Sequence, residues 1–390
     1  MEAIFYRELA YVFGAALAGG VAAKALRQPL IVGYVLGGIV IGPFTPGVAI
    51  SEIHQFEILA EIGVILLMYS IGLEFSFKEL MQVKWVGIVG APLGIALSIG
   101  LSLGVGSLMH WTVVQSIAIG AIISVASTMV LSKLLIDRGE LRATQGRVMI
   151  GITLVEDLAV VVLTVLLPSL GSTTTDHLVA LAIGVGKAIL ILIPVGFIAA
   201  KLVPPLMQRV SRTRNDELYL LVILALGFAT AAVTQAVGLS LALGAFLAGM
   251  VVSGSESHKT LDRLLPLRDA FVALFFVTIG ALVDPRVLLH QPVLWIVIVL
   301  LIVLGKLFIW TAVVWLFRYP LKTALLIGAG LTQIGEFSYV LVRVARDSQI
   351  VDDNIYNAVL AASVITIVIN GLIMRAIPRM GTSQPSRELS

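Results

Sequence analysis

The sequence predicts an all-α polytopic membrane protein with thirteen transmembrane helices, arranged as two inverted six-helix repeats. Three observations lead to this prediction. Hydrophobic residues make up 59% of the 390 residues and charged residues only 13%, a balance far from that of soluble domains. Apolar segments long enough to cross a bilayer recur from one end of the chain to the other. The second half also repeats sequence patterns of the first half.

The predicted helices follow from these apolar segments and from the polar residues that separate them. They are expected at residues 5–25, 31–43, 56–73, 85–108, 112–134, 147–170, 178–201, 216–236, 239–254, 269–283, 293–317, 321–345 and 355–377. The first helix lacks the basic start and the small-residue cleavage site of a signal peptide, so no signal peptide is expected. The chain has no cysteine, which excludes disulfides and thiolate metal ligands.

The basic residues predict how the helices are oriented. With the N-terminus outside, twenty Lys and Arg residues fall on the inner side and four on the outer side, while Lys187 and Lys306 lie within helices. Inner loops of membrane proteins carry an excess of Lys and Arg. We therefore expect an integral membrane protein with the N-terminus outside and the C-terminus in the cytoplasm. The expected location is the bacterial inner membrane. Because these basic residues flank the membrane, the expected partner is the lipid bilayer and not a nucleic acid.

An internal repeat predicts the arrangement of the two halves. Residues 33–41 (GYVLGGIVI) align with residues 244–252 (GAFLAGMVV), and residues 66–72 (LLMYSIG) align with residues 274–280 (LFFVTIG). The first six helices therefore correspond to the last six, with the helix at 178–201 left between them. An odd linker helix places the two halves in opposite orientations, as in secondary transporters with inverted repeats. The alternative is that small-residue patterns recur by chance in membrane helices.

Two adjacent acids, Glu156 and Asp157, lie in the middle of the apolar helix at 147–170. A charged side chain near the centre of a bilayer costs at least about 2.5–3.5 kcal/mol, so such residues are candidates for function. The repeat aligns the two acids with Val364 and Ile365, which shows that they are not part of the repeated scaffold. We therefore expect the acids to serve transport and not folding.

Lys306 is the expected counter-charge for one of the acids. Adjacent residues of a helix point about 100° apart, so one acid can face a cavity while the other takes a counter-charge. Lys306 lies at a similar depth in the helix at 293–317, where an unpaired lysine would lose its proton by desolvation. The alternative is that Glu156 and Lys306 form an ion pair that only fixes helix packing.

The helices at 112–134 and 321–345 are predicted to be discontinuous. The polar and small residues at their centres are Ser124, Ser127 and Thr128 in the first and Gln333, Gly335 and Glu336 in the second. Unwound segments free backbone carbonyls for cation coordination and direct half-helix dipoles at the site. The alternative is ordinary helix packing through small residues.

The chain resembles the Kef/NapA branch of monovalent cation/proton antiporters in four segments. They are residues 27–43 (RQPLIVGYVLGGIVIGP), 66–75 (LLMYSIGLEF), 155–158 (VEDL) and 330–342 (GLTQIGEFSYVLV). The resemblance extends over residues 10–377, and its most specific parts are the first segment and the GEF motif. It implies a homodimer in which a mobile core domain moves against a static dimer domain.

The resemblance also implies how the chain divides into domains. The dimer domain would contain helices 1–3 and 8–10, and the core domain helices 4–6 and 11–13. The implied parts are residues 1–83 and 216–290 for the dimer domain, 84–170 and 291–378 for the core domain, 171–215 for the linker helix and 379–390 for a polar tail. Helices 5 and 12 would cross at their unwound centres beside the acid pair.

On matching positions, the resemblance implies a role for each candidate residue. Asp157 would be the carboxylate that binds an alkali cation or a proton, and Glu156 would be its neighbour. Lys306 matches the core lysine of the sodium-type members. Ser127 and Thr128 match the break of helix 5. The remaining candidates are Ser124, Gln333 and Gly335 at the helix breaks and Glu336 as a supporting core charge.

The chain departs from the resemblance at Glu156. Kef-type potassium systems typically have an amide before the aspartate, and sodium-type members typically have two aspartates. The sequence also ends in a short polar tail and does not include the nucleotide-binding domain common in Kef systems. A regulatory domain or subunit at the cytoplasmic C-terminus is therefore left as a possible partner.

The expected function is exchange of Na⁺ or K⁺ for H⁺ by alternating access of the core domain. If Glu156 also exchanges a proton, two protons would cross per cation; otherwise exchange would be one for one. The alternatives are a Kef-like K⁺/H⁺ efflux antiporter, an organic-anion/sodium symporter of similar architecture, and a channel. No nucleophile–base pair or metal cluster is apparent, so neither an enzyme nor a cofactor is expected.

Overall fold

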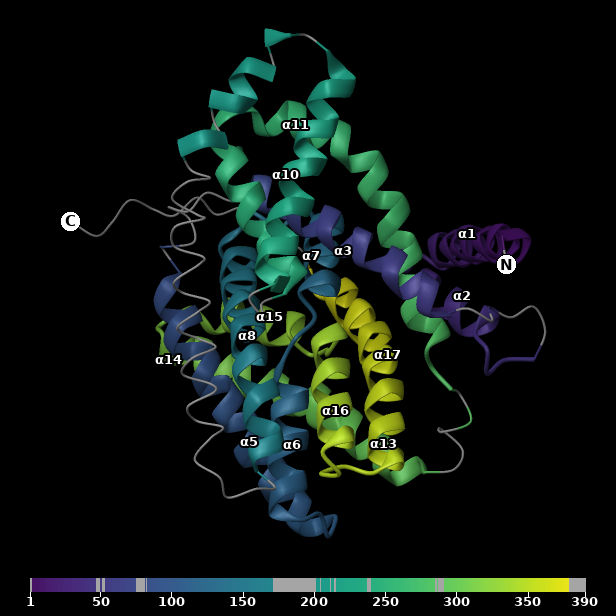
Figure 1. The fold of residues 1–390 in the computed structure, drawn as a ribbon. Helices are drawn as coiled ribbons and strands as arrows, with labels where there is room; N and C mark the ends of the chain where they lie inside the picture. The colour runs from purple at the N-terminus through teal and green to yellow at the C-terminus, as the bar shows by residue number, and fades with distance from the viewer. Residues whose placement is uncertain are drawn as a thin grey trace.

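The fold is described by a computed structural model that covers residues 2–46, 50, 53–74, 81, 83–170, 201–203, 205–210, 212–213, 215–236, 240–284, 286 and 291–378. All regular secondary structure in these residues is helical (Figure 1). Eight helical segments among them are long and apolar enough to cross a membrane, and three shorter apolar helices accompany them. Residues 178–200 of the predicted linker helix and the predicted polar tail lie outside the described residues.

The helices have the following bounds. In the first half they are α1 (Glu2–Ala25), α2 (Leu30–Ile41), α3 (Ile53–Glu74), the π-helical turn η1 (Val86–Gly90), α5 (Ala91–Leu108), α6 (Val113–Ser124), α7 (Thr128–Arg138) and α8 (Thr144–Ser169). In the second half they are α10 (Asp216–Ala236), α11 (Leu241–Ala281), α13 (Pro292–Leu300), the π-helical turn η2 (Leu301–Gly305), α14 (Lys306–Leu316), α15 (Leu321–Gly330), α16 (Glu336–Asp347) and α17 (Asp353–Ala376).

The long helix α11 differs from the prediction, which placed two separate helices at 239–254 and 269–283. Gly249 of α11 lies against Gly72 of α3, and Phe271 of α11 lies against Gly63 of α3. On straight helices these positions would be about 14 Å apart along α3 but about 33 Å apart along α11, at 1.5 Å per residue. α11 therefore bends over α3. Pro266 lies inside α11 and supplies a cause for the bend, since proline removes a helix hydrogen bond.

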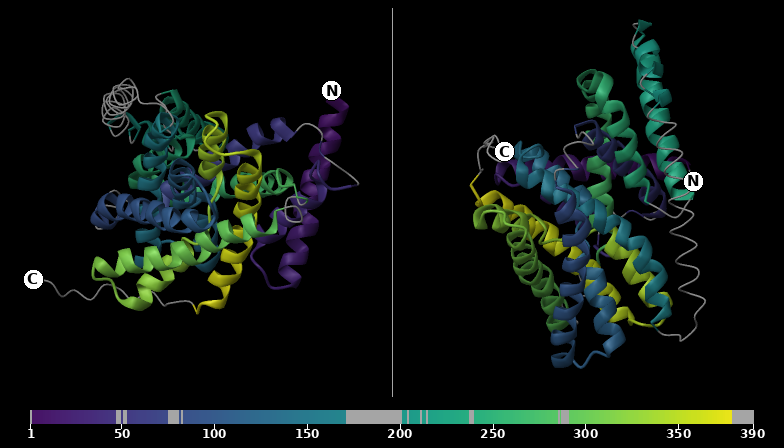
Figure 2. Two further views of the ribbon diagram at one scale, coloured as in Figure 1. Left: turned by 90° about the horizontal axis from the view of Figure 1, so that it is seen from below. Right: turned by 90° about the vertical axis from the view of Figure 1, so that its left-hand side faces the viewer.

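The helices pack in two groups. α1, α2, α3, α10 and α11 pack mainly on one another, while α5 to α8 pack with α13 to α17 and with both π-helical turns. The view from below in Figure 2 shows α1 at one edge of the molecule, far from the light-green helices α14 and α15. Each group is formed from both halves of the sequence.

Close glycine contacts hold the first group together. Gly38 of α2 and Gly280 of α11 lie so close that a Cβ atom on either would collide with the facing backbone. Gly72 of α3 and Gly249 of α11 form a second contact of the same kind. Only glycine permits such close approach of two helices. The segments in these two contacts are the ones that the internal repeat aligns with each other.

Candidate ion-binding site

Two broken helices meet in the core of the second group. α6 ends at Ser124 and α7 begins at Thr128, with Val125 and Ser127 in extended backbone conformation. α15 ends at Gly330 and α16 begins at Glu336, and the residues between them are not helical. The predicted discontinuity of both helices is therefore present. Such breaks leave backbone N–H and C=O groups that need other partners.

The side chain of Gln333 satisfies both backbone groups of Ser127. The N–H of Ser127 donates to Gln333 Oε1 at 2.9 Å, and Gln333 Nε2 donates to the Ser127 carbonyl at 3.0 Å. Gly335 packs directly on Ser127, where a Cβ atom would collide. One amide side chain thus joins the two breaks, and we call this pair of bonds the Gln333 clamp.

Glu156 and Lys306 complete the joint between the breaks. Glu156 Oε2 accepts a hydrogen bond from the Ala126 N–H at 2.9 Å. Lys306 Nζ donates to the Gln333 carbonyl at 3.1 Å. Both side chains are fully or almost fully buried, and their opposite charges attract each other. In the described part of the chain, Lys306 contacts the broken backbone instead of forming a direct ion pair with Glu156.

The backbone around Lys306 is also irregular. Lys306 follows η2 directly and is the first residue of α14. Single π-helical turns inside α-helices occur often at functional sites because they change the direction in which the next side chains point. η2 therefore contributes to the position of the Lys306 ammonium.

Asp157 lies on the other side of the same joint and is only 3% exposed. The hydroxyl of Thr128 lies 3.2 Å from Asp157 Oδ2 and 3.4 Å from Oδ1. Thr128 is the first residue of α7, and Ser127 caps this helix by accepting from the Val130 N–H. The positive end of the α7 dipole therefore points at the carboxylate. Carboxylate and hydroxyl oxygens are hard ligands suited to a small cation.

The remaining predicted residues are placed less directly. Ser124 is buried, but its hydroxyl donates to the Ala121 carbonyl one turn earlier in its own helix. The side chain of Glu336 lies outside the described residues, although its backbone begins α16. Of the candidates, Ser127, Thr128, Glu156, Asp157, Lys306, Gln333 and Gly335 form one cluster.

Two buried polar residues that the sequence analysis did not identify support this cluster. Asn370 Nδ2 donates to the Ala329 carbonyl at 2.7 Å, which satisfies the end of α15. Ser338 Oγ donates to the Ile122 carbonyl at 2.8 Å and joins α16 to α6. For Asn370, the sequence does contain a signal, namely an asparagine within the apolar run TIVINGLIM. For Ser338, a single serine after GEF gives no such signal.

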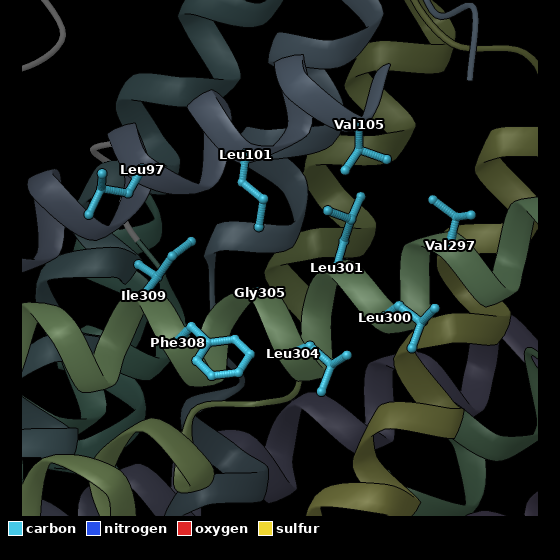
Figure 3. A pocket seen from close by; sticks show the side chains of 10 residues that line it. All are labelled: Leu97, Leu101, Val105, Val297, Leu300, Leu301, Leu304, Gly305, Phe308 and Ile309. Atoms are coloured by element: carbon cyan, nitrogen blue, oxygen red, sulfur yellow. The ribbon is translucent and has the colours of Figure 1, made fainter. Parts of the chain in front are cut away.

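An apolar groove of about 470 Å³ lies beside the cluster, between α5 and the η2 region. Figure 3 shows its lining of aliphatic side chains and Phe308, together with the backbone position of Gly305. Phe308 is 67% exposed, as expected for a surface that faces lipid tails. The groove offers no polar side chain to an ion, so it is not a candidate ion pathway.

Comparison with known proteins gives consistent results. The family model described as "Sodium/hydrogen exchanger, transmembrane" matches residues 12–379. The putative cation/proton antiporter YbaL of Escherichia coli (strain K12) is 38% identical over 363 residues, covering 91% of this chain and 65% of YbaL. K(+) efflux antiporter 4 of Arabidopsis thaliana is 35% identical over 378 residues, covering 95% of this chain and 63% of that protein. The chain thus spans less than two thirds of the length of these relatives.

A solved structure shares the fold. The sodium proton antiporter MjNhaP1 from Methanocaldococcus jannaschii, determined at pH 8, matches with a TM-score of 0.67. The match covers 96% of this chain and 97% of that one, at 15% sequence identity. At this identity the likeness concerns the fold alone.

Proposed function

The chain belongs to the sodium/hydrogen exchanger family, and we propose that it exchanges an alkali cation, Na⁺ or K⁺, for protons across a membrane. The names of its relatives support this activity, since they are a cation/proton antiporter and K(+) efflux antiporters. Membership in the family favours exchange over the organic-anion symporter and the channel that the sequence left open.

The observation that carries the proposal is the position of Asp157. Its buried carboxylate lies at the hydroxyl of Thr128 and at the N-terminus of α7, where the two broken helices meet. An ionised carboxylate is costly to bury in a membrane interior. Binding of either a proton or a cation removes most of that cost, and one carboxylate serves one of them at a time. Competition at Asp157 therefore couples cation movement to proton movement.

Glu156 and Lys306 set the number of protons in this proposal. If Glu156 keeps its charge throughout the cycle, Asp157 alone exchanges, and transport is one for one. If Glu156 takes up a proton when the cation leaves, two protons cross per cation and net charge moves. The attraction between Glu156 and Lys306 is the interaction that such a proton would weaken.

The packing supports a division into a dimer domain and a core domain. The group of α1 to α3 with α10 and α11 corresponds to the dimer domain at 1–83 and 216–290, and the other group to the core domain at 84–170 and 291–378. Homodimers would form through the first, and the second would carry the ion in alternating access. The linker region 171–215 and the tail 379–390 would connect the halves and lead to any regulatory domain or subunit.

The glycine contacts support the inverted repeat. The sequence alignment pairs Gly38 with Gly249 and Gly72 with Gly280. The contact of Gly38 with Gly280 is therefore equivalent to the contact of Gly249 with Gly72. Two equivalent contacts of this kind are expected when the halves are related by a two-fold axis.

Potassium is the second candidate for the cation. The relatives named K(+) efflux antiporters favour it, whereas the combination of Lys306 with two acids resembles sodium-type antiporters. The orientation with the N-terminus outside and a location in the bacterial inner membrane are also part of the proposal.

Transport in proteoliposomes tests the proposal. A pH gradient is imposed, and its dissipation is measured after addition of Na⁺, K⁺ or Li⁺. We expect a response to at least one cation in the unaltered protein and its loss in Asp157→Asn. The control is Asp347→Asn, because Asp347 is exposed at the end of α16. An unchanged response in Asp157→Asn would refute the assignment of the site.

A further inference from the structure

A second cavity, of about 340 Å³, lies at one end of the helical bundle. Its walls come from the link between α1 and α2, from the last residues of α7 and from the end of α17. The start of α7 lies at the ion site and its end lies at this cavity, so the two are about 15 Å apart at 1.5 Å per residue. The cavity lies where the two groups of helices meet.

The charges around the cavity do not balance. Asp137 pairs with Lys133 at 3.2 Å. Arg138 is also satisfied, because its guanidinium donates to Glu140 and to the carbonyls of Met374 and Ile377. The other two arginines of the lining, Arg27 and Arg375, have no acidic partner among the described residues. Among the described residues, positive charge around the cavity therefore exceeds negative charge.

Arg27 and Arg375 approach from different groups of helices. Arg27 belongs to the α1–α2 link and has a left-handed backbone, with φ of 54°, which is unfavourable for a residue with a side chain. Arg375 belongs to α17, and its Nη1 donates to the Leu26 carbonyl at 3.3 Å. Arg375 is thereby held beside Arg27, with further guanidinium N–H groups left for a ligand.

We propose that this cavity binds a phosphate-bearing anion between Arg27 and Arg375. The guanidinium group has a planar fork of donors that matches phosphate oxygens. A phosphate held by both arginines would join the α1–α2 link to α17 and so oppose relative movement of the two groups. This effect on transport depends on the proposed function, whereas binding does not.

The phosphate has two possible sources, and one binding experiment distinguishes them. The purified protein is placed in phosphatidylcholine nanodiscs, and thermal unfolding is followed by the fluorescence of its five tryptophans. Pyrophosphate is titrated at constant ionic strength as the soluble probe. In parallel, part of the phosphatidylcholine is replaced by phosphatidylglycerol. A ligand that binds only the folded protein raises the unfolding midpoint with rising ligand concentration.

The variants are R27Q combined with R375Q, and R318Q as the matched control. Arg318 is also an exposed arginine with a left-handed backbone, at φ of 65°, but it does not line the cavity. We expect the midpoint to rise in the unaltered protein and in R318Q, and the rise to be lost in the double variant. A response to pyrophosphate identifies a soluble ligand, and a response only to phosphatidylglycerol identifies a lipid headgroup.

Two results would overturn the proposal: no response to either probe, or equal responses in the double variant and the unaltered protein. The transport consequence is measured in the proteoliposome assay, where the bound anion should slow exchange in the unaltered protein and not in the double variant. An unchanged rate would overturn this consequence. If the unaltered protein shows no exchange with any cation, the proposed function fails, and the binding result still stands.

Discussion

The substitution Thr128→Val tests whether the hydroxyl beside Asp157 takes part in cation binding. Valine keeps the branched shape of threonine, so packing around the first residue of α7 is preserved while the hydroxyl is lost. A hydrogen bond to a charged group contributes about 1.5–3 kcal/mol. The Thr128 hydroxyl lies 3.2 Å and 3.4 Å from the two carboxylate oxygens, longer than the 2.5–2.7 Å of the strongest such bonds. We therefore expect a loss of about 1–1.5 kcal/mol, at or just below the lower end of that range.

This loss corresponds to an increase of about 5- to 12-fold in the cation concentration that gives half-maximal exchange, since about 1.4 kcal/mol is a factor of ten. The measurement is the cation dependence of pH-gradient dissipation in proteoliposomes. Thr128→Ser should stay close to the unaltered protein because it retains the hydroxyl. Ser132→Ala is a second control, because the Ser132 hydroxyl donates to the Thr128 carbonyl and not to Asp157. An unchanged cation dependence in Thr128→Val, with normal behaviour of both controls, would refute the role of this hydroxyl.

Two further substitutions test the joint between the helix breaks and the proton count. In Gly335→Ala the new Cβ would collide with Ser127, so we expect a lower yield of folded protein by size-exclusion chromatography and loss of exchange. The control Gly100→Ala should behave normally, because its new Cβ meets open space. Normal folding and exchange in Gly335→Ala would contradict the close packing of the breaks. Glu156→Gln keeps an acceptor for the Ala126 N–H but removes an ionisable group, so if two protons cross per cation, the dependence of exchange on an imposed membrane potential should disappear. A full retained dependence would count against the two-proton cycle.

The sequence was sufficient to predict an all-helical membrane fold, the two helix breaks and the burial of the acid pair beside them. The physical reason is the same in each case, because a polar or helix-breaking residue inside a bilayer is costly. Asp157 and the segment GAGLTQIGEF therefore each indicate a functional or broken part of a helix from the single sequence. The location of the breaks follows from such local signals. That Lys306 lies close to the two breaks and the acid pair was predicted from its expected depth in the membrane and from the family resemblance.

The specific partners could not be predicted, because hydrogen bonds between distant segments have no local signal. Gln333 was identified as a residue of a break, but not as the group that satisfies the backbone of Ser127 in the other break. Lys306 was expected as the counter-charge of one acid, and its charge is attracted to that of Glu156, but its hydrogen bond to the Gln333 carbonyl was not predicted. The continuity of α11 was also missed, since the polar residues between its two apolar parts separated them into two predicted helices, whereas the backbone stays helical through them.

For the proposed transport cycle, the distribution of hydrogen bonds indicates which part of the protein can move. Around the candidate ion site, the Gln333 clamp and the bonds from Lys306 and Ala126 are buried and connect the two helix breaks with each other, with α8 and with α14. Breaking them would leave unsatisfied polar groups away from water, at about 1–3 kcal/mol each. The bond from Arg375 to the Leu26 carbonyl, which joins the two groups of helices, is exposed, so water can replace it at little cost. If exchange proceeds as proposed, fewer buried hydrogen bonds are broken when the second group of helices moves as a body against α1 to α3, α10 and α11 than when the site opens from within. In terms of hydrogen bonds alone, this difference favours rigid-body alternation with Asp157 and Thr128 kept together.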